Sequence, residues 1–346
     1  MGSTGFSSVD YTKAAGVLRS SGKSFARAAT ARATGNFKSI AEHLDPRKLK
    51  NGVRECCFAP GFSDALPIIV SIDATGSMDQ VPFTVQAELP KLIELLLEQG
   101  VSDRPNVLFM AHDDEQAIGP DACFQISQFE TGASELLGAC NELVIPHNGG
   151  GNRGESYHLA VYAAARHTRL EAHERDGSKG FLFLIGDEEP IIGNGDPLVQ
   201  GTSPEIAREC FGDSLEAEVP LVKSLMEAGE KFHIFLIRPH HTSHGQNPAI
   251  TKAWRDLFRA AGINAENVQE VADTSAIIST IALTVGTILG ADRSELVSVL
   301  QSKGAAGIDA ATSATQALVP VAGALLAKAA QVSGNLPAVT AGRVRS

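Results

Sequence analysis

Long apolar runs, C-x-x-C motifs and an excess of positive charge are all missing from this 346-residue chain. The longest apolar candidate, Ala317 to Ala327, contains Pro320 and is shorter than the ~20 residues of a membrane helix, so we expect no membrane span. No apolar segment follows Met1, which predicts that the chain has no secretory signal. The five cysteines are odd in number and match no zinc pattern, which favours a reducing cytoplasm.

Basic residues are outnumbered, with 29 Lys and Arg against 40 Asp and Glu and a net charge of −11. Affinity for nucleic acid comes mainly from cationic surface, so we expect no nucleic acid as a partner. The charge is uneven, because residues 1–54 contain 10 basic and 3 acidic side chains. We therefore expect residues 1–60 to form a basic helical extension beside an acidic domain.

Apolar strand patterns alternate with helical patterns from residue 66 to residue 289. Strands are predicted at 66–72, 106–111, 124–129, 180–186, 231–237 and 268–271. Helices are predicted at 83–98, 133–143, 155–173, 220–228, 249–261 and 275–289. The alternation predicts an α/β fold with a doubly wound, mostly parallel sheet that allows one antiparallel edge strand. We expect this domain to span 64–290, with C-terminal helices over 291–333 and a flexible tail over 334–346.

Polar side chains follow two of these strands directly. Asp73, Thr75 and Ser77 follow the first strand in "IDATGSM", and Asp187 follows strand 180–186 in "LIGDEEP". Between them the glycine-rich segment 147–160 offers Asn, Glu and Ser side chains. Ligands collect at the carboxyl ends of parallel strands, so we expect these three segments to meet. Their oxygen and amide donors, without Cys or His, are typical of a site for a hard cation.

The first segment taken alone has a simpler interpretation. Asp or Ser before a helix is a common N-cap, and Thr-Gly-Ser is ordinary loop sequence. The matching positions of Asp187 and of the glycine-rich segment favour the cation site over this helix start.

The stretch Asp-x-Thr-Gly-Ser-Met at the end of the first strand resembles the metal-ion-dependent adhesion site of von Willebrand factor A (VWA) domains. The likeness covers roughly residues 64–290 and is closest to intracellular bacterial members, which carry a "GGGN..ES" loop. The resemblance implies a Rossmann-like VWA fold that binds Mg²⁺, or Mn²⁺ or Ca²⁺. It implies the following ligands: Asp73, Thr75 and Ser77 from the first motif, Asp187 from the third, and Asn152 from the second. The second motif departs from the family, because an amide replaces the usual hydroxyl or carboxylate, and Ser156 or Asn148 are the alternatives.

The resemblance implies a non-catalytic module in which the bound ion captures an Asp or Glu of a partner protein. The hydroxyl ligands are neutral, so the ion keeps much of its positive charge and attracts an anion. Intracellular relatives act beside AAA-type ATPases or in larger assemblies. We expect the partner to touch the surrounding residues Glu155, Glu188, His112 and Asp113.

Two other functions stay open at this stage. A haloacid-dehalogenase-like phosphoryl-transfer enzyme would use Asp73 as nucleophile, but the second acid expected after Asp187 is replaced by Ile191. The second open function is a metal-free scaffold that assembles through its basic N-terminal arm.

Overall fold

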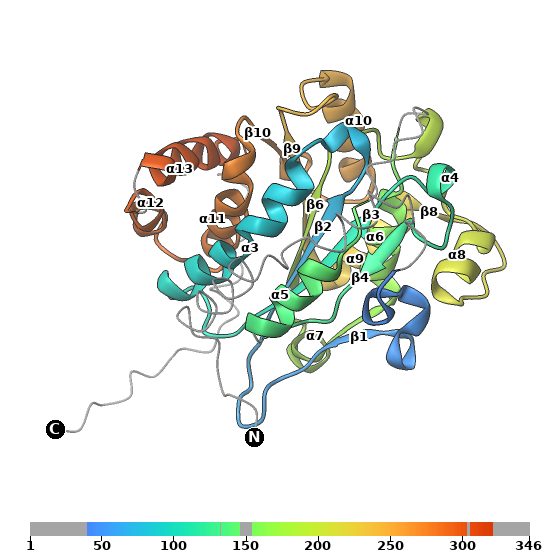
Figure 1. Ribbon diagram of the computed structural model, residues 1–346, viewed down its shortest axis with the longest axis horizontal. Coiled ribbons are helices and arrows are strands. Elements are labelled where there is room, and N and C mark those ends of the chain that lie inside the picture. The colour runs from blue at the N-terminus through green and yellow to red at the C-terminus, as the bar shows by residue number, and fades with distance from the viewer. Residues whose placement is uncertain (1–39, 132, 146–153, 303–304, 321–346) are drawn as a thin grey trace.

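A six-stranded sheet runs through the centre of the computed structural model (Figure 1), which describes residues 40–131, 133–145, 154–302 and 305–320. Its strands lie in the order β10-β9-β6-β2-β3-β4. Neighbouring strands are parallel except β4, which pairs antiparallel with β3 at one edge. The strands are β2 Leu66–Asp73, β3 Pro105–His112, β4 Phe124–Ile126, β6 Gly180–Ile185, β9 Phe232–Pro239 and β10 Val268–Val271. The predicted α/β class with a mostly parallel sheet is confirmed.

The strand order reverses direction at β2. The chain leaves β2 toward β3 on one side and later returns to β6 on the other side. In the β2–β6 pair, Ile72 lies opposite Ile185, so the segments that follow both strands begin next to each other. Such a switch point is where open α/β sheets bind ligands.

Helices cover both faces of the sheet (Figure 1). Along β2, Ile68, Val70 and Ile72 belong to one apolar core, whereas Ile69 belongs to the other, as the two-residue period of a strand requires. The first core is completed by α3 Val81–Glu98, α5 Ala133–Glu142, α11 Ile277–Ile288, α12 Arg293–Gln301 and α13 Ala305–Leu318. The second core is completed by α6 Tyr157–Arg166, α8 Pro204–Phe211, α9 Leu221–Lys231 and α10 Pro248–Ala260.

The predicted helix over 155–173 is wrong as a single element. Helix α6 ends at Arg166, β5 (Thr168–Leu170) pairs with β1 (Arg54–Cys56), and α7 (Glu171–Asp176) follows. The Thr168 hydroxyl donates to Ala164 O at 2.6 Å, and Arg54 N donates to His167 O at 2.8 Å. The helix is interrupted because β5 pairs with β1, a strand far away in sequence. A local helical pattern cannot predict such a distant pairing.

The described part of the N-terminal region is not a long helix. Three 3-10 turns, at Glu42–Leu44, Pro46–Lys48 and Lys50–Gly52, lead into β1. The buried Arg54 side chain donates to His43 O at 2.6 Å and to Ile126 O at 2.9 Å, which fastens this segment to β4. Residues 1–39 lie outside the described part.

The C-terminal helices share the first core. Leu296 and Leu300 of α12 and Leu318 of α13 are buried in the cluster that contains α3 and α11. Helix α13, within the predicted helical range 291–333, begins at Ala305 and ends at Leu318. Within the described residues, no helix has the length and apolar character needed to cross a membrane.

Candidate functional site

Asp73 is the last residue of β2, and its side chain has no exposed surface. Its Oδ1 accepts hydrogen bonds from Thr75 N at 2.9 Å and from Thr75 Oγ1 at 2.7 Å. Thr75 precedes a 3-10 turn at Gly76–Met78, yet its side chain caps none of the turn's N–H groups. The polar side chains therefore face the strand end, unlike the side chain of an N-cap residue.

Ser77 connects this turn to the segment after β6. Its Oγ lies 3.1 Å from Thr75 Oγ1 and donates to Asp187 Oδ1 at 2.8 Å. Asp73, Thr75, Ser77 and Asp187 thus form one continuous set of closely spaced oxygens, which we term the carboxylate–hydroxyl chain. The structure brings together the four ligands expected from the first and third motifs.

Tyr157, the first residue of α6, holds the other oxygen of Asp73. Its hydroxyl donates to Asp73 Oδ2 at 3.2 Å and accepts from Glu188 N at 3.3 Å. A Cβ on Gly186 would lie 1.9 Å from the Tyr157 hydroxyl oxygen, so only glycine leaves room for this contact. Our reading of the sequence missed both Tyr157 and Gly186. The available signal was the position of Tyr157 directly after the glycine-rich segment.

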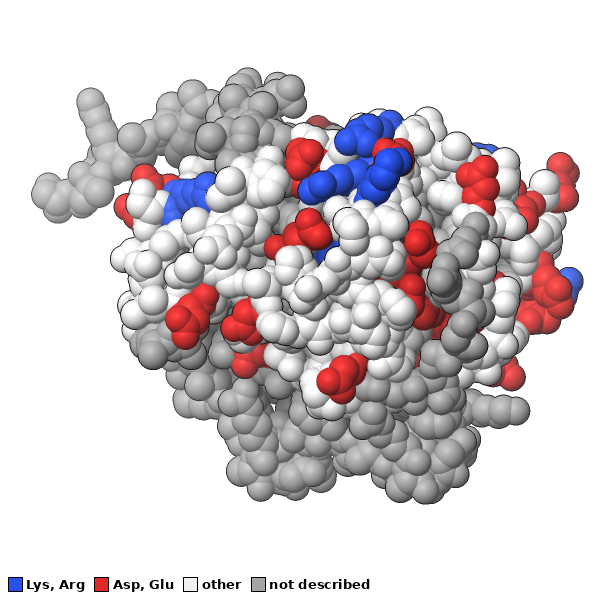
Figure 2. Space-filling model, turned by 90° about the horizontal axis from the view of Figure 1, so that it is seen from above, with Lys and Arg blue, Asp and Glu red and all other residues white. Residues whose placement is uncertain are grey.

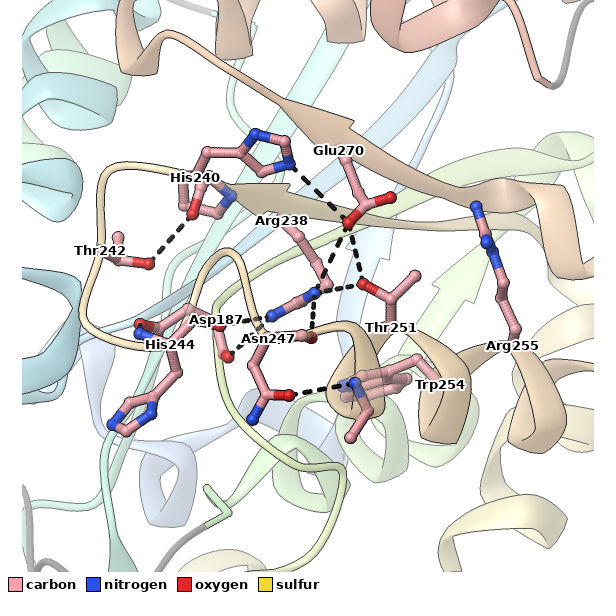
Figure 3. A network of polar contacts seen from close by, with 12 residues as sticks. Asp187, Arg238, His240, Thr242, His244, Asn247, Thr251, Trp254, Arg255 and Glu270 are labelled. Atoms are coloured by element: carbon pink, nitrogen blue, oxygen red, sulfur yellow. Dashed lines mark hydrogen bonds and ion pairs between the residues drawn. The ribbon is translucent and has the colours of Figure 1, made fainter.

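Arg238 at the end of β9 fixes the loop that covers Asp187 (Figure 3). The guanidinium is fully buried and donates to Asp187 O at 3.2 Å, His244 O at 2.8 Å and Asn247 O at 3.3 Å. It also donates to the Thr251 hydroxyl on α10. This arrangement lets His244 N donate to Asp187 Oδ2 at 3.0 Å, so both oxygens of Asp187 are hydrogen-bonded. No sequence pattern indicates that Arg238 is buried, because strands seldom end in a buried cation.

Further acidic side chains are buried around the carboxylate–hydroxyl chain. Burial and then the charge of Asp187 raise the pKa of Asp73 to about 8. Burial and then the charge of Asp73 raise the pKa of Glu155 to about 11, with further contributions from Asp113, Asp114 and Glu188. Glu155 Oε2 has no hydrogen-bond partner among the described residues. Buried carboxylates at this density must be protonated or compensated by a positive charge.

The residues expected to touch a partner are placed differently from the prediction. Glu155, Glu188, His112 and Asp113 are all buried, so their side chains do not form an exposed contact surface. His112 Nδ1 lies 3.1 Å from Ser71 Oγ under the sheet end, and burial lowers the pKa of His112 to about 3. Loops that fold over a strand end bury their charges, which the sequence order alone does not reveal.

The second-motif ligand has no confirmed position. Asn148 and Asn152 lie outside the described residues. Ser156 is buried, and its Oγ accepts from Glu115 N at 3.1 Å, at the start of α4 (Glu115–Ile118). Ser156 therefore supports α4, and this contact does not involve the carboxylate–hydroxyl chain.

The spacing of the oxygens in the carboxylate–hydroxyl chain suits a small divalent cation. Mg²⁺ takes six oxygens at about 2.1 Å, which places neighbouring ligands about 3 Å apart. Successive oxygens from Asp73 to Asp187 are separated by 2.7, 3.1 and 2.8 Å. A cation could therefore replace the shared hydrogens with little movement of the side chains, and Asp73, Thr75, Ser77 and Asp187 would hold it.

Comparison with known proteins does not place the chain in a family. No family model matches it, and no curated protein matches it. Among solved structures, the pilus adhesin SpaC from Lactobacillus rhamnosus GG in its open conformation aligns with a TM-score of 0.45 and 11% identity. The alignment covers 68% of this chain and 31% of the adhesin chain. A second structure of SpaC gives a TM-score of 0.44, also at 11% identity, over 67% of this chain and 31% of that one. Likeness at this level transfers no function.

These findings overturn the family expected from the sequence. No family model and no curated protein supports the VWA family, so membership of that family and the name metal-ion-dependent adhesion site are withdrawn. Across the described residues, no three or more His, Cys, Asp or Glu side chains are grouped to hold a metal ion, so the structure contains no metal site built from those side chains alone. The short motif at the end of a strand was enough to predict the geometry around Asp73. It was not enough to identify a family.

Proposed function

We propose that the chain is a non-catalytic protein-binding module whose carboxylate–hydroxyl chain takes up Mg²⁺, or Mn²⁺ or Ca²⁺, at the end of a doubly wound sheet. The observation that carries this proposal is the unbroken set of closely spaced oxygens from Asp73 to Asp187, which have the spacing of cation ligands. The buried carboxylates around it support the proposal, because a divalent cation would compensate their charge.

Two neutral hydroxyls among the four ligands leave a bound cation with part of its positive charge. Such an ion would attract a carboxylate of another protein. The approach is from the side of Gly76 and Ser77, because Gly76 is exposed and Ser77 is partly exposed whereas Asp73 and Asp187 are fully buried. The expectation of an AAA-type ATPase rested on the withdrawn family, so we propose only the partner's chemistry, an exposed Asp or Glu.

Phosphoryl transfer by Asp73 is the less favoured function. A nucleophile needs an oxygen that the phosphorus atom can reach in line. Both oxygens of Asp73 are hydrogen-bonded, one to Thr75 and one to Tyr157, and the side chain has no exposed surface. This geometry supports a role for Asp73 in holding an ion.

Capture of a partner with and without free Mg²⁺ tests the proposal. The full chain, Asp73→Asn and Asp79→Asn would be immobilised and exposed to a lysate of the source cells, with Mg²⁺ or with EDTA. Asp79 is a matched control, because it is an exposed carboxylate two residues after Ser77. We expect a protein retained by the wild type and by Asp79→Asn in Mg²⁺ and lost with EDTA or Asp73→Asn. Retention that ignores EDTA and Asp73→Asn would contradict the proposal, as would phosphate release from a generic phosphoester that disappears in Asp73→Asn.

A further inference from the structure

Cys123 and Cys210 are 87 residues apart in the sequence, and their sulfur atoms lie 3.8 Å apart in the fold. Both side chains are buried. Both sulfurs also approach the same acceptor, Pro120 O, at 3.8 Å for Cys123 and 3.7 Å for Cys210. The function proposed above uses neither thiol.

The two cysteines join separate parts of the molecule. Cys123 directly precedes the edge strand β4, and Cys210 lies in the last turn of α8. Their neighbours Phe124 and Phe211 pack with ring centroids 5.5 Å apart, so the two backbones are already held together beside the sulfurs. A bond between the sulfurs would therefore link two segments that are already in contact in the folded protein.

We propose that Cys123 and Cys210 are a modification site at which a disulfide forms between α8 and the segment before β4. Closing the bond requires the sulfurs to approach from 3.8 Å to about 2.05 Å. In the reaction the two thiols give up two protons and two electrons to a low-molecular-weight disulfide such as oxidised glutathione. That compound is reduced to two thiols, and one S–S bond forms as another breaks.

The bond would also stiffen the acidic end of the sheet. Cys123 O accepts from Asp113 N at 2.8 Å, and the Asp114 side chain accepts from Gln116 N and Ala117 N to cap α4. Tying Cys123 to α8 limits the movement of this segment. This consequence concerns the stability of the segment and is independent of whether a cation binds.

Access decides when the bond forms. Hydrogen bonding to Cys210 and burial both raise the pKa of Cys123, so the folded protein holds few reactive thiolates. We expect oxidation to be slow in the folded protein and fast when the chain refolds in a glutathione redox buffer.

The experiment compares the full chain refolded in oxidising and in reducing glutathione buffer. Peptide mapping without reduction should find peptides containing Cys123 and Cys210 joined, and the oxidised protein should melt about 5–15 °C higher than the reduced one. Cys123→Ser and Cys210→Ser should each abolish this difference. Cys140→Ser is the matched control, because Cys140 is also buried and its thiol is not one of the pair in contact, and it should keep the difference.

Three results would overturn the proposal. The first is the absence of a Cys123–Cys210 linkage after both native oxidation and refolding. The second is a linkage through the exposed Cys57 in place of this pair. The third is a melting shift that survives Cys210→Ser.

Discussion

Asp73 and Asp187 are carboxylates without exposed surface, connected through the hydroxyls of Thr75 and Ser77. Two such charges in a poorly solvated place repel each other, and each loses its hydration. Hydrogen bonds from Thr75, Tyr157 and His244 N offset only part of this cost. The remaining cost makes the site responsive to protons and to cations.

The pH dependence of stability follows from the raised pKa of Asp73. A carboxyl whose pKa is about 8 in the folded protein and 3.8 when unfolded binds more protons in the folded state between these values. Stability without a divalent cation should therefore fall as pH rises toward 8, by up to about 1.4 kcal/mol per pH unit for one proton. The low pKa of His112 opposes this trend below pH 6.5, so the window is pH 6.5–8.

Urea unfolding at several pH values in EDTA checks this dependence. Asp73→Asn should reduce the slope in this window, because the amide does not titrate. Saturating Mg²⁺ should also flatten it. A wild-type stability that is constant or rises from pH 6.5 to pH 8 in EDTA would disprove the account of Asp73.

Tyr157→Phe tests the hydroxyl that bridges β2 and the segment after β6. The ring would keep its packing against Trp254, whose centroid is 5.0 Å away, but Asp73 Oδ2 would lose its donor and Glu188 N its acceptor. We expect a loss of about 1–3 kcal/mol in the free energy of unfolding. No change in urea denaturation would mean that the hydroxyl is not a structural link.

At the scale of elements, the backbone just after β6 lies very close to the first residue of α6. Only a glycine at position 186 leaves room for this approach. Gly186→Ala would place its Cβ 1.9 Å from the Tyr157 hydroxyl oxygen and 2.7 Å from the ring. We expect a destabilisation of about 1–3 kcal/mol or more, because the ring is enclosed and cannot move freely. Gly138→Ala on α5 is the control, since a Cβ there meets nothing within 4 Å, and it should leave stability unchanged or raise it. Equal effects of the two changes would contradict this packing.

The loop after β9 depends on Arg238 in a similar way. Arg238→Lys would replace a fork that reaches Asp187 O, His244 O and Asn247 O with a single ammonium group. We expect a loss of about 2–4 kcal/mol in chemical denaturation. Arg259→Lys, an exposed arginine of α10, should change stability by less than about 0.5 kcal/mol. Unchanged stability of Arg238→Lys would show that the loop is held by other contacts.

The elements show what a sequence can and cannot predict. Strands β2, β3, β6, β9 and β10 were predicted within two residues at each end, because buried parallel strands are continuous apolar runs. Asp73 and Asp187 were placed together correctly, since parallel strands carry their ends to one edge. β1, β5, Tyr157 and Arg238 escaped prediction, because their roles depend on contacts between segments distant in sequence. Glu155 and its neighbours were expected to touch a partner, but their side chains are buried, for the same reason.

At the scale of the whole molecule, the C-terminal helices complete the first core. Leu296 of α12 is 1% exposed, and a Cβ on Gly286 of α11 would lie 2.6 Å from its Cδ1. Leu296→Ala should therefore cost about 2–5 kcal/mol in the free energy of unfolding. Val319→Ala, at a 65% exposed residue, should have almost no effect. A small effect of Leu296→Ala would indicate that α12 is not part of the cooperative unit.

Charge at this scale fits a protein whose partners are not polyanions. The chain carries a net −11, and on the face shown in Figure 2 Asp and Glu are scattered, while Lys and Arg form one larger group and lie singly elsewhere. The cytoplasmic location and the absence of nucleic acid binding stay predictions from composition.

Calorimetric titration of Mg²⁺ into the full chain tests the central claim most directly. The account predicts binding of one ion in the millimolar range or tighter, weakened at least about 10-fold by Asp73→Asn and by Ser77→Ala but unchanged by Asp79→Asn. No detectable heat or stabilisation from Mg²⁺, Mn²⁺ or Ca²⁺, or binding that survives Asp73→Asn, would contradict it.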